Sequence, residues 1–138
     1  MTRAHRLYAL GATVLGLHVV DDTLMQPQPG TGPGDHLAGA LVPIALLALA
    51  VWAFPRLSGA ARGALALVTG IFGAVVSVEA IHYTSTVGPS GDDFTGLLAV
   101  PAALLLLGLG AVTLWTTRRT TGNHPWRYGR RAGYAAAG

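Results

Sequence analysis

The stretch GALALVTGIFGAVVSVEAIHY, residues 63–83, decides the fold of this chain. It carries no charge as far as Val78, and a membrane-spanning helix needs about 20 largely apolar residues. To reach that length the helix must take in Glu79, His82 and Tyr83. Glu79 and His82 share a helical face because they are three residues apart. Ionisable groups on a membrane helix are costly, so the stretch predicts a span whose polar end needs partners elsewhere in the chain.

The composition of the whole chain indicates the same class of protein. Charged residues make up 11% of the 138 residues, against about 25% in an average soluble domain, and the mean hydropathy is +0.50. The chain has no Cys, which excludes thiolate metal sites, disulfide relays and cysteine nucleophiles. Although the isoelectric point is about 10.0, the Arg residues flank apolar runs. We therefore expect a lipid bilayer, and not nucleic acid, as the partner.

Three other apolar segments can cross a membrane when their polar ends are included. We predict an all-α, polytopic membrane protein with four transmembrane helices, at about residues 6–25, 36–54, 62–83 and 93–116. They form one domain, residues 1–117, followed by an Arg-rich tail, residues 118–138, that we expect to be flexible. The first span resembles a secretory signal, but no small-residue cleavage site follows it, so we expect it to stay uncleaved.

Charge placement predicts the orientation. The nine basic residues, all Arg, lie on one side of the predicted membrane, and the six acidic residues lie towards the other. The basic residues are Arg3, Arg6, Arg56, Arg62, Arg118, Arg119, Arg127, Arg130 and Arg131. The positive-inside rule then places both termini in the cytoplasm of a multi-pass protein of the plasma membrane. The tail is interpreted either as a topology anchor or as a segment that binds anionic lipid.

The two halves of the chain share a spacing of polar and turn residues. A shift of 58 positions superposes four pairs: Asp21 with Glu79, Gly30 with Gly88, Asp35 with Asp93, and Pro43 with Pro101. Two parallel hairpin repeats would explain the match. Chance alignment of apolar sequence would explain it equally well.

Polar residues gather at the outer edge of the predicted spans. They are His18, Asp21, Asp22, Asp35, His36, Glu79, His82, Tyr83, Asp92 and Asp93. Glu-x-x-His is the spacing used by carboxylate-bridged di-metal bundles, and imidazole with carboxylate suits Zn, Fe or Mn. We expect spans one and three to face each other, with His18, Asp21, Asp22, Glu79 and His82 as candidate ligands of a divalent metal.

Other interpretations of these residues remain open. The same groups could satisfy one another by hydrogen bonds and fix helix packing without any ligand, or could serve a proton or substrate. Asp35 and Asp93 each precede a predicted helix and are candidate N-caps. His36 and Asp22 are candidates for solvated groups at the interface.

Several segments resemble the amino-terminal membrane region of actinobacterial α/β-hydrolases. They are VVDDTLMQPQPGT (19–31), GDHL (34–37), EAIHY (79–83) and GPSGDDFTGLL (88–98), and the resemblance extends over about residues 5–131. In that family a serine-hydrolase domain follows the membrane region. This chain contains neither a G-x-S-x-G motif nor the rest of a triad, so hydrolase activity is not implied.

The resemblance implies a membrane module that anchors or regulates a hydrolase domain or another membrane protein, without catalysis of its own. The alternative is a small membrane metal-binding protein or metalloenzyme that uses His18, Asp21, Glu79 and His82. A homo-oligomer is compatible with both hypotheses. Metal content of the purified protein distinguishes the two.

Overall fold

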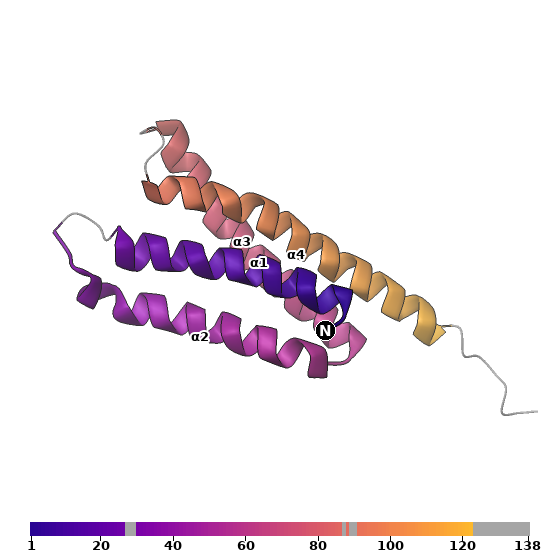
Figure 1. The fold of residues 1–138 in the computed structure, drawn as a ribbon. Helices are drawn as coiled ribbons and strands as arrows, with labels where there is room; N and C mark the ends of the chain where they lie inside the picture. The colour runs from indigo at the N-terminus through magenta and orange to yellow at the C-terminus, as the bar shows by residue number, and fades with distance from the viewer. Residues whose placement is uncertain (27–29, 87, 89–90, 123–138) are drawn as a thin grey trace, which may run out of the picture.

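The computed structural model describes the backbone of residues 1–26, 30–86, 88 and 91–122, and their side chains except at 91–94, 121 and 122. All regular structure in these ranges is helical, which confirms the all-α class (Figure 1). The four α-helices are α1 (Arg3–Val20), α2 (Leu37–Ala53), α3 (Gly59–Thr86) and α4 (Gly91–Gly122). A π-helical turn, Asp21–Met25, continues α1, and 3₁₀ turns, Pro33–His36 and Phe54–Arg56, flank α2.

Successive helices run in opposite directions (Figure 1). The N-terminus, the α2–α3 turn and the end of α4 therefore lie at one end of the bundle, which we call the arginine end after Arg3, Arg6, Arg56, Arg62, Arg118 and Arg119. The α1–α2 and α3–α4 connections lie at the opposite end. We call it the carboxylate end after Asp21, Asp22, Asp35 and Glu79. The separation of charge read from the sequence is thus a separation along the long axis of the bundle.

Side-chain caps define where two of the helices begin. The Thr2 hydroxyl accepts a hydrogen bond from the His5 backbone N–H at 3.2 Å, at the start of α1. The Ser58 hydroxyl accepts one from the Ala61 N–H at 3.3 Å, at the start of α3. Both satisfy donors that a helix start leaves without an intrahelical partner. The α2–α3 connection can therefore be short without exposing backbone groups.

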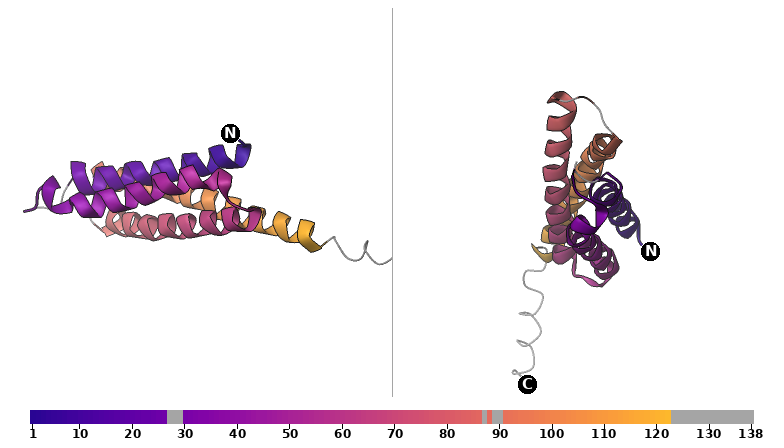
Figure 2. Two further views of the ribbon diagram at one scale, coloured as in Figure 1. Left: turned by 90° about the horizontal axis from the view of Figure 1, so that it is seen from below. Right: turned by 90° about the vertical axis from the view of Figure 1, so that its left-hand side faces the viewer.

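Small residues determine how α3 and α4 pack. Buried positions on α3 recur every three or four residues, at Gly63, Ala66, Gly70, Gly73, Ser77 and Ala80. Such a seven-residue repeat of small side chains lets two membrane helices approach closely. The two backbones come close at Gly63 and Gly110, where a Cβ on Gly110 would lie 2.8 Å from the Gly63 carbonyl oxygen. Figure 2 shows the two helices together from two directions.

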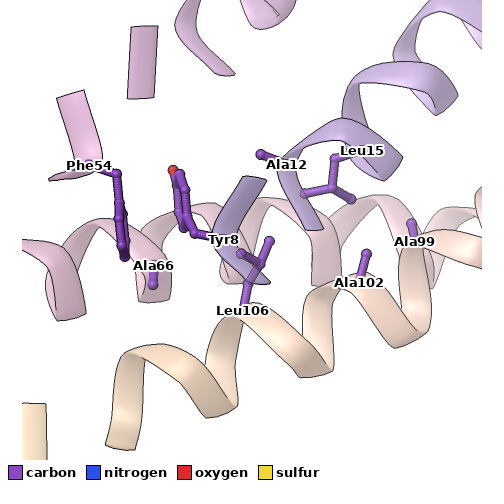
Figure 3. Packing of buried hydrophobic residues seen from close by; sticks show 8 residues of the cluster. All are labelled: Tyr8, Ala12, Leu15, Phe54, Ala66, Ala99, Ala102 and Leu106. Carbon is purple, nitrogen blue, oxygen red and sulfur yellow. The ribbon is translucent and has the colours of Figure 1, made fainter. Parts of the chain in front are cut away.

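The apolar core lies where α1 meets the other three helices (Figure 3). Tyr8 is fully buried, and its ring stacks on Phe54 with centroids 4.3 Å apart. The Tyr8 hydroxyl is 2.9 Å from Thr69 Oγ1, so the one polar atom of this side chain has a partner on α3. Leu15 and Leu106 fill the space over Gly73 and Gly11. α1 is thus the helix that joins the two hairpins.

Within the described residues, three segments are long and apolar enough to cross a membrane: Pro33–Arg56, Gly59–Thr86 and Thr95–Thr120. α1 is not among them, because Arg3, His5, Arg6 and His18 lower its mean hydropathy. The structure thus supports a membrane protein with several apolar helices.

The α1–α2 hairpin and the α3–α4 hairpin also show the shift of 58 positions in their connections. The helical segment after the first connection begins at Pro33 and that after the second at Gly91, again 58 positions apart. The connections contain Gly30 at φ 90° and Gly88 at φ 93°, a backbone conformation that favours glycine. These local features support the duplication. The packing differs between the halves, because α4 contacts α1 extensively whereas α2 barely touches α3.

Candidate functional site

A chain of hydrogen bonds links α1 to α4 at the carboxylate end. His18 Nδ1 is 3.1 Å from Thr95 Oγ1, and the Thr95 hydroxyl donates to Asp21 Oδ2 at 2.6 Å. All three side chains are partly buried. His18 and Asp21 come from the last turn of α1 and the start of the π-helical turn, and Thr95 comes from the second turn of α4. We call this arrangement the His18–Thr95–Asp21 network.

The network fixes the tautomer of His18. A hydroxyl has one proton, and the Thr95 proton is directed to Asp21. The contact between Thr95 and His18 must therefore be donated by the ring, as Nδ1–H to Oγ1. In neutral His18 the Nε2 atom then carries the lone pair.

The π-helical turn brings Asp21 into position. Its wider turn shifts the residues after Val20 relative to a continuous α-helix, and such turns are frequent at functional sites. The Thr23 hydroxyl donates to the Val19 carbonyl within this turn. The other Asp21 oxygen, Oδ1, lies 3.5 Å from Gln26 Nε2, at the long limit of a hydrogen bond. Both carboxylate oxygens therefore have a neighbouring donor.

Glu79 and His82 do not join this network. Both are exposed, as is Tyr83, and the His82 and Tyr83 rings meet edge to face with centroids 5.9 Å apart. The packing of the small residues on α3 explains why. Ala80 is one of these buried small residues and faces Gly96 of α4. Glu79 precedes Ala80, so its side chain is rotated about 100° out of the interface. The expected meeting of spans one and three at this level is replaced by a meeting of α1 with α4.

Asp35 and His36 serve the connection between α1 and α2. Asp35 Oδ2 accepts from the Gly32 backbone N–H at 2.8 Å, and His36 Nε2 lies 2.8 Å from Thr31 Oγ1. Asp35 is therefore the third residue of the 3₁₀ turn, and Gly32, not Asp35, is the N-cap residue. Asp22 is exposed on the π-helical turn. The side chains of Asp92 and Asp93 lie outside the described residues.

No three His, Asp or Glu side chains of the described residues are grouped as a metal site requires. His18 and Asp21 are joined through Thr95, whereas Glu79 and His82 lie on an exposed face of α3. The donor set present is therefore a hydrogen-bonded network built around a hydroxyl. The hypothesis of a divalent metal held by His18, Asp21, Asp22, Glu79 and His82 stays a prediction.

Sequence reasoning missed two residues that organise these sites. Thr95 is a single hydroxyl in the stretch DDFTGLL, and its position on the α1-facing side follows from the buried stripe Gly96, Ala99, Ala103 and Leu106. Tyr8 lies in a run whose flanking Arg residues suggested a helix end at the interface, yet among the described residues it is the largest fully buried side chain. For Thr95 the informative signal is the periodicity of buried residues on its own helix, α4.

Comparisons with protein families, with curated proteins and with solved structures gave no match for this chain.

Proposed function

We propose that the chain is a four-span module of the plasma membrane with both termini in the cytoplasm, which anchors or regulates a partner protein without catalysing a reaction. The partner class suggested by the sequence resemblance is an α/β-hydrolase domain. The observation that carries the proposal is the His18–Thr95–Asp21 network, which ties the least apolar helix, α1, to α4 at the carboxylate end. A regulatory signal that shifts α1 against α4 would have to break or remake this network.

The packing of α1 supports its assignment as a fourth span. Gly11 of α1 receives Leu106 of α4, and Tyr8 and Leu15 are buried between the helices. If α2, α3 and α4 cross the bilayer, α1 lies at the same depth along its whole length (Figure 1). Its two Arg residues then lie at the arginine end, and Asp21 and Asp22 lie at the carboxylate end. This placement is the one that the positive-inside rule favours.

The interior supports a structural rather than a catalytic role. The buried polar side chains described are Thr69 and Ser77, and both donate to carbonyl groups of their own helix, Thr69 to Leu65 at 2.9 Å and Ser77 to Gly73 at 2.7 Å. A hydroxyl bonded in this way stabilises packing and is not poised for chemistry. The metal-binding alternative has no such supporting contact in the described residues.

Single cysteines test the topology, because the chain contains none of its own. We expect Gly32→Cys and Ser90→Cys to react with a membrane-impermeant maleimide added to intact cells, and Ser58→Cys and Gly122→Cys to react only after lysis. Labelling of Ser58→Cys in intact cells would contradict the four-span orientation.

Co-expression tests the anchoring role. An actinobacterial α/β-hydrolase domain without its own membrane region should move into the membrane fraction, as esterase activity, when this chain is present. Thr95→Val, which breaks the network, should alter that activity if the role is regulatory, whereas Thr116→Val on the exposed face of α4 should not. Activity that stays soluble with the chain present would refute the association. Near-stoichiometric Zn, Fe or Mn in the purified chain would instead favour the metal-binding alternative.

A further inference from the structure

An apolar groove of about 540 Å³ lies between α2 and α3. Pro43, Leu46 and Ala53 line it from α2, Leu57 from the connecting turn, and Val68 and Phe72 from α3. Its volume falls in the range of about 300–1,000 Å³ that small-molecule sites occupy. Thr69 is the polar residue of the lining, and its hydroxyl is already bonded to Leu65 and Tyr8. The surface of the groove that is available to a ligand is therefore apolar.

Cationic side chains stand at the arginine end of this groove. Arg62 donates from Nε to the Phe54 carbonyl at 3.0 Å and from a terminal nitrogen to the Pro55 carbonyl at 2.8 Å. These bonds hold the guanidinium against the turn that contains Leu57, and its remaining N–H groups can bind an anion. Arg56 lies over the Trp52 ring, 4.0 Å from its centroid. The described carboxylates lie at the opposite end of the bundle, so none of them neutralises this pair.

We propose that the groove binds one acyl chain of an anionic glycerophospholipid whose phosphate is held by Arg56 and Arg62. Arg is suited to this role because its planar N–H groups match phosphate oxygens. Trp is enriched at the level of lipid headgroups, so Trp52 places the mouth of the groove where a phosphate lies. The inference rests on the proposed membrane embedding of the bundle, and it does not depend on the hydrolase partner or on the His18–Thr95–Asp21 network.

Charge favours a lipid over a second copy of the chain as the occupant. Copies inserted in one membrane share one orientation, so a second copy would bring its own Arg residues to the same end. Like charges in that position repel, whereas an anionic headgroup complements them. The groove is also open along exposed apolar positions, such as Leu46 and Val68, that already face the hydrocarbon of the bilayer.

The test uses native mass spectrometry of the full chain in detergent, titrated with phosphatidylglycerol or phosphatidylcholine. We expect one phosphatidylglycerol per chain, bound about tenfold more tightly than phosphatidylcholine, because each Arg contributes a modest attraction to an anionic headgroup. Arg56→Gln should reduce the preference to about threefold. Arg119→Gln is the matched control, since Arg119 also covers a Trp ring, 4.6 Å from the centroid of Trp115, at the same end but away from the groove.

A second pair of variants tests the acyl site. Val68 and Val75 are both 65% exposed on α3, but only Val68 is part of the groove lining. Val68→Phe should fill the groove and weaken both lipids, and Val75→Phe should leave both unchanged. Because neither valine packs inside the bundle, the melting temperature should stay unchanged in both variants.

Several results would overturn the proposal. They include equal binding of the two lipids, equal effects of Arg56→Gln and Arg119→Gln, equal effects of Val68→Phe and Val75→Phe, and a stable dimer that excludes lipid. A preference that disappears only when Arg127, Arg130 and Arg131 are replaced would assign lipid binding to the tail and would likewise overturn it. None of these outcomes decides the four-span topology, which cysteine labelling tests separately.

Discussion

At the level of single residues, Thr95 tests the hydrogen-bond network most directly. Thr95→Val keeps the shape of the side chain but removes the hydroxyl, so that His18 Nδ1–H and Asp21 Oδ2 lose a partner. Each partly buried polar group left without a partner costs about 1–3 kcal/mol. We expect a clear fall in melting temperature in detergent, and Thr95→Ser should restore most of it.

Thr116→Val is the matched control for that measurement. Thr116 is an exposed residue of the same helix, and its hydroxyl bonds only to the carbonyls of Val112 and Thr113. Its replacement should change the melting temperature little. An equal loss for Thr95→Val and Thr116→Val would mean that the network contributes no stability of its own.

For Glu79, in contrast to Thr95, we expect substitution to have little effect on stability. It is exposed on α3, and the network that bridges the helices nearby is made by Asp21 instead. Glu79→Gln and Glu79→Leu should therefore both change the free energy of unfolding by less than about 0.5 kcal/mol, as surface substitutions usually do. Asp21→Leu, measured alongside, should be severely destabilising. A strong effect of Glu79→Leu, together with a rise in stability on adding Zn, Mn or Fe, would revive the metal hypothesis.

At the level of helices, the crossing of α3 and α4 depends on glycine. Gly110→Ala would place a Cβ 2.8 Å from a backbone oxygen, which cannot move aside as a flexible side chain can. We expect the two helices to separate and the melting temperature to fall. Gly108→Ala meets nothing within 4 Å, and it should stabilise α4 by up to about 1 kcal/mol because Ala is the better helix former.

The comparison of these two glycines, two residues apart, isolates the interface from helix propensity. If Gly108→Ala and Gly110→Ala change stability alike, the close approach at Gly63 does not determine the packing. Accessibility of a cysteine introduced at Ser77, which is buried in the same interface, provides a second measurement of separation.

The sequence predicted the positions of the helices better than it predicted the contacts between them. Apolar runs and flanking Arg residues were sufficient to locate four helices, because the length of a span and the side of its charges follow from the bilayer itself. Which face of a helix meets which neighbour is decided by small residues, and Ala80 rather than Glu79 sets the face of α3. The π-helical turn at Asp21 was not predictable from residue type. α4 also runs further than expected, through Arg118 and Arg119 to Gly122.

For the whole molecule, we expect the α3–α4 hairpin to be stable by itself and the α1–α2 hairpin to depend on it. α3 and α4 pack along their lengths through small residues, whereas the buried face of α1 is largely covered by α4. We expect residues 59–138, expressed alone, to insert and to resist proteolysis. Residues 1–58 alone should be degraded, and co-expression of both pieces should protect the first.

Two outcomes would contradict this division. Residues 1–58 that are protease-resistant by themselves would show that α1 and α2 suffice for each other. Residues 59–138 that are degraded unless residues 1–58 are present would show that α1 is needed to hold α3 against α4. A Gly110→Ala control in the second piece should abolish its protection of the first.

The contact of α1 with α4 has a consequence for biosynthesis. Of the four described α-helices, α1 is translated before the others and is the least apolar, and α4, which packs against it, is translated after the others. We therefore expect α1 to be incompletely packed until α4 has been translated. Nascent chains stalled before residue 91 lack Ala99, Ala102 and Leu106 of the core, so Tyr8 should be more accessible to chemical modification in them than in chains released after residue 122.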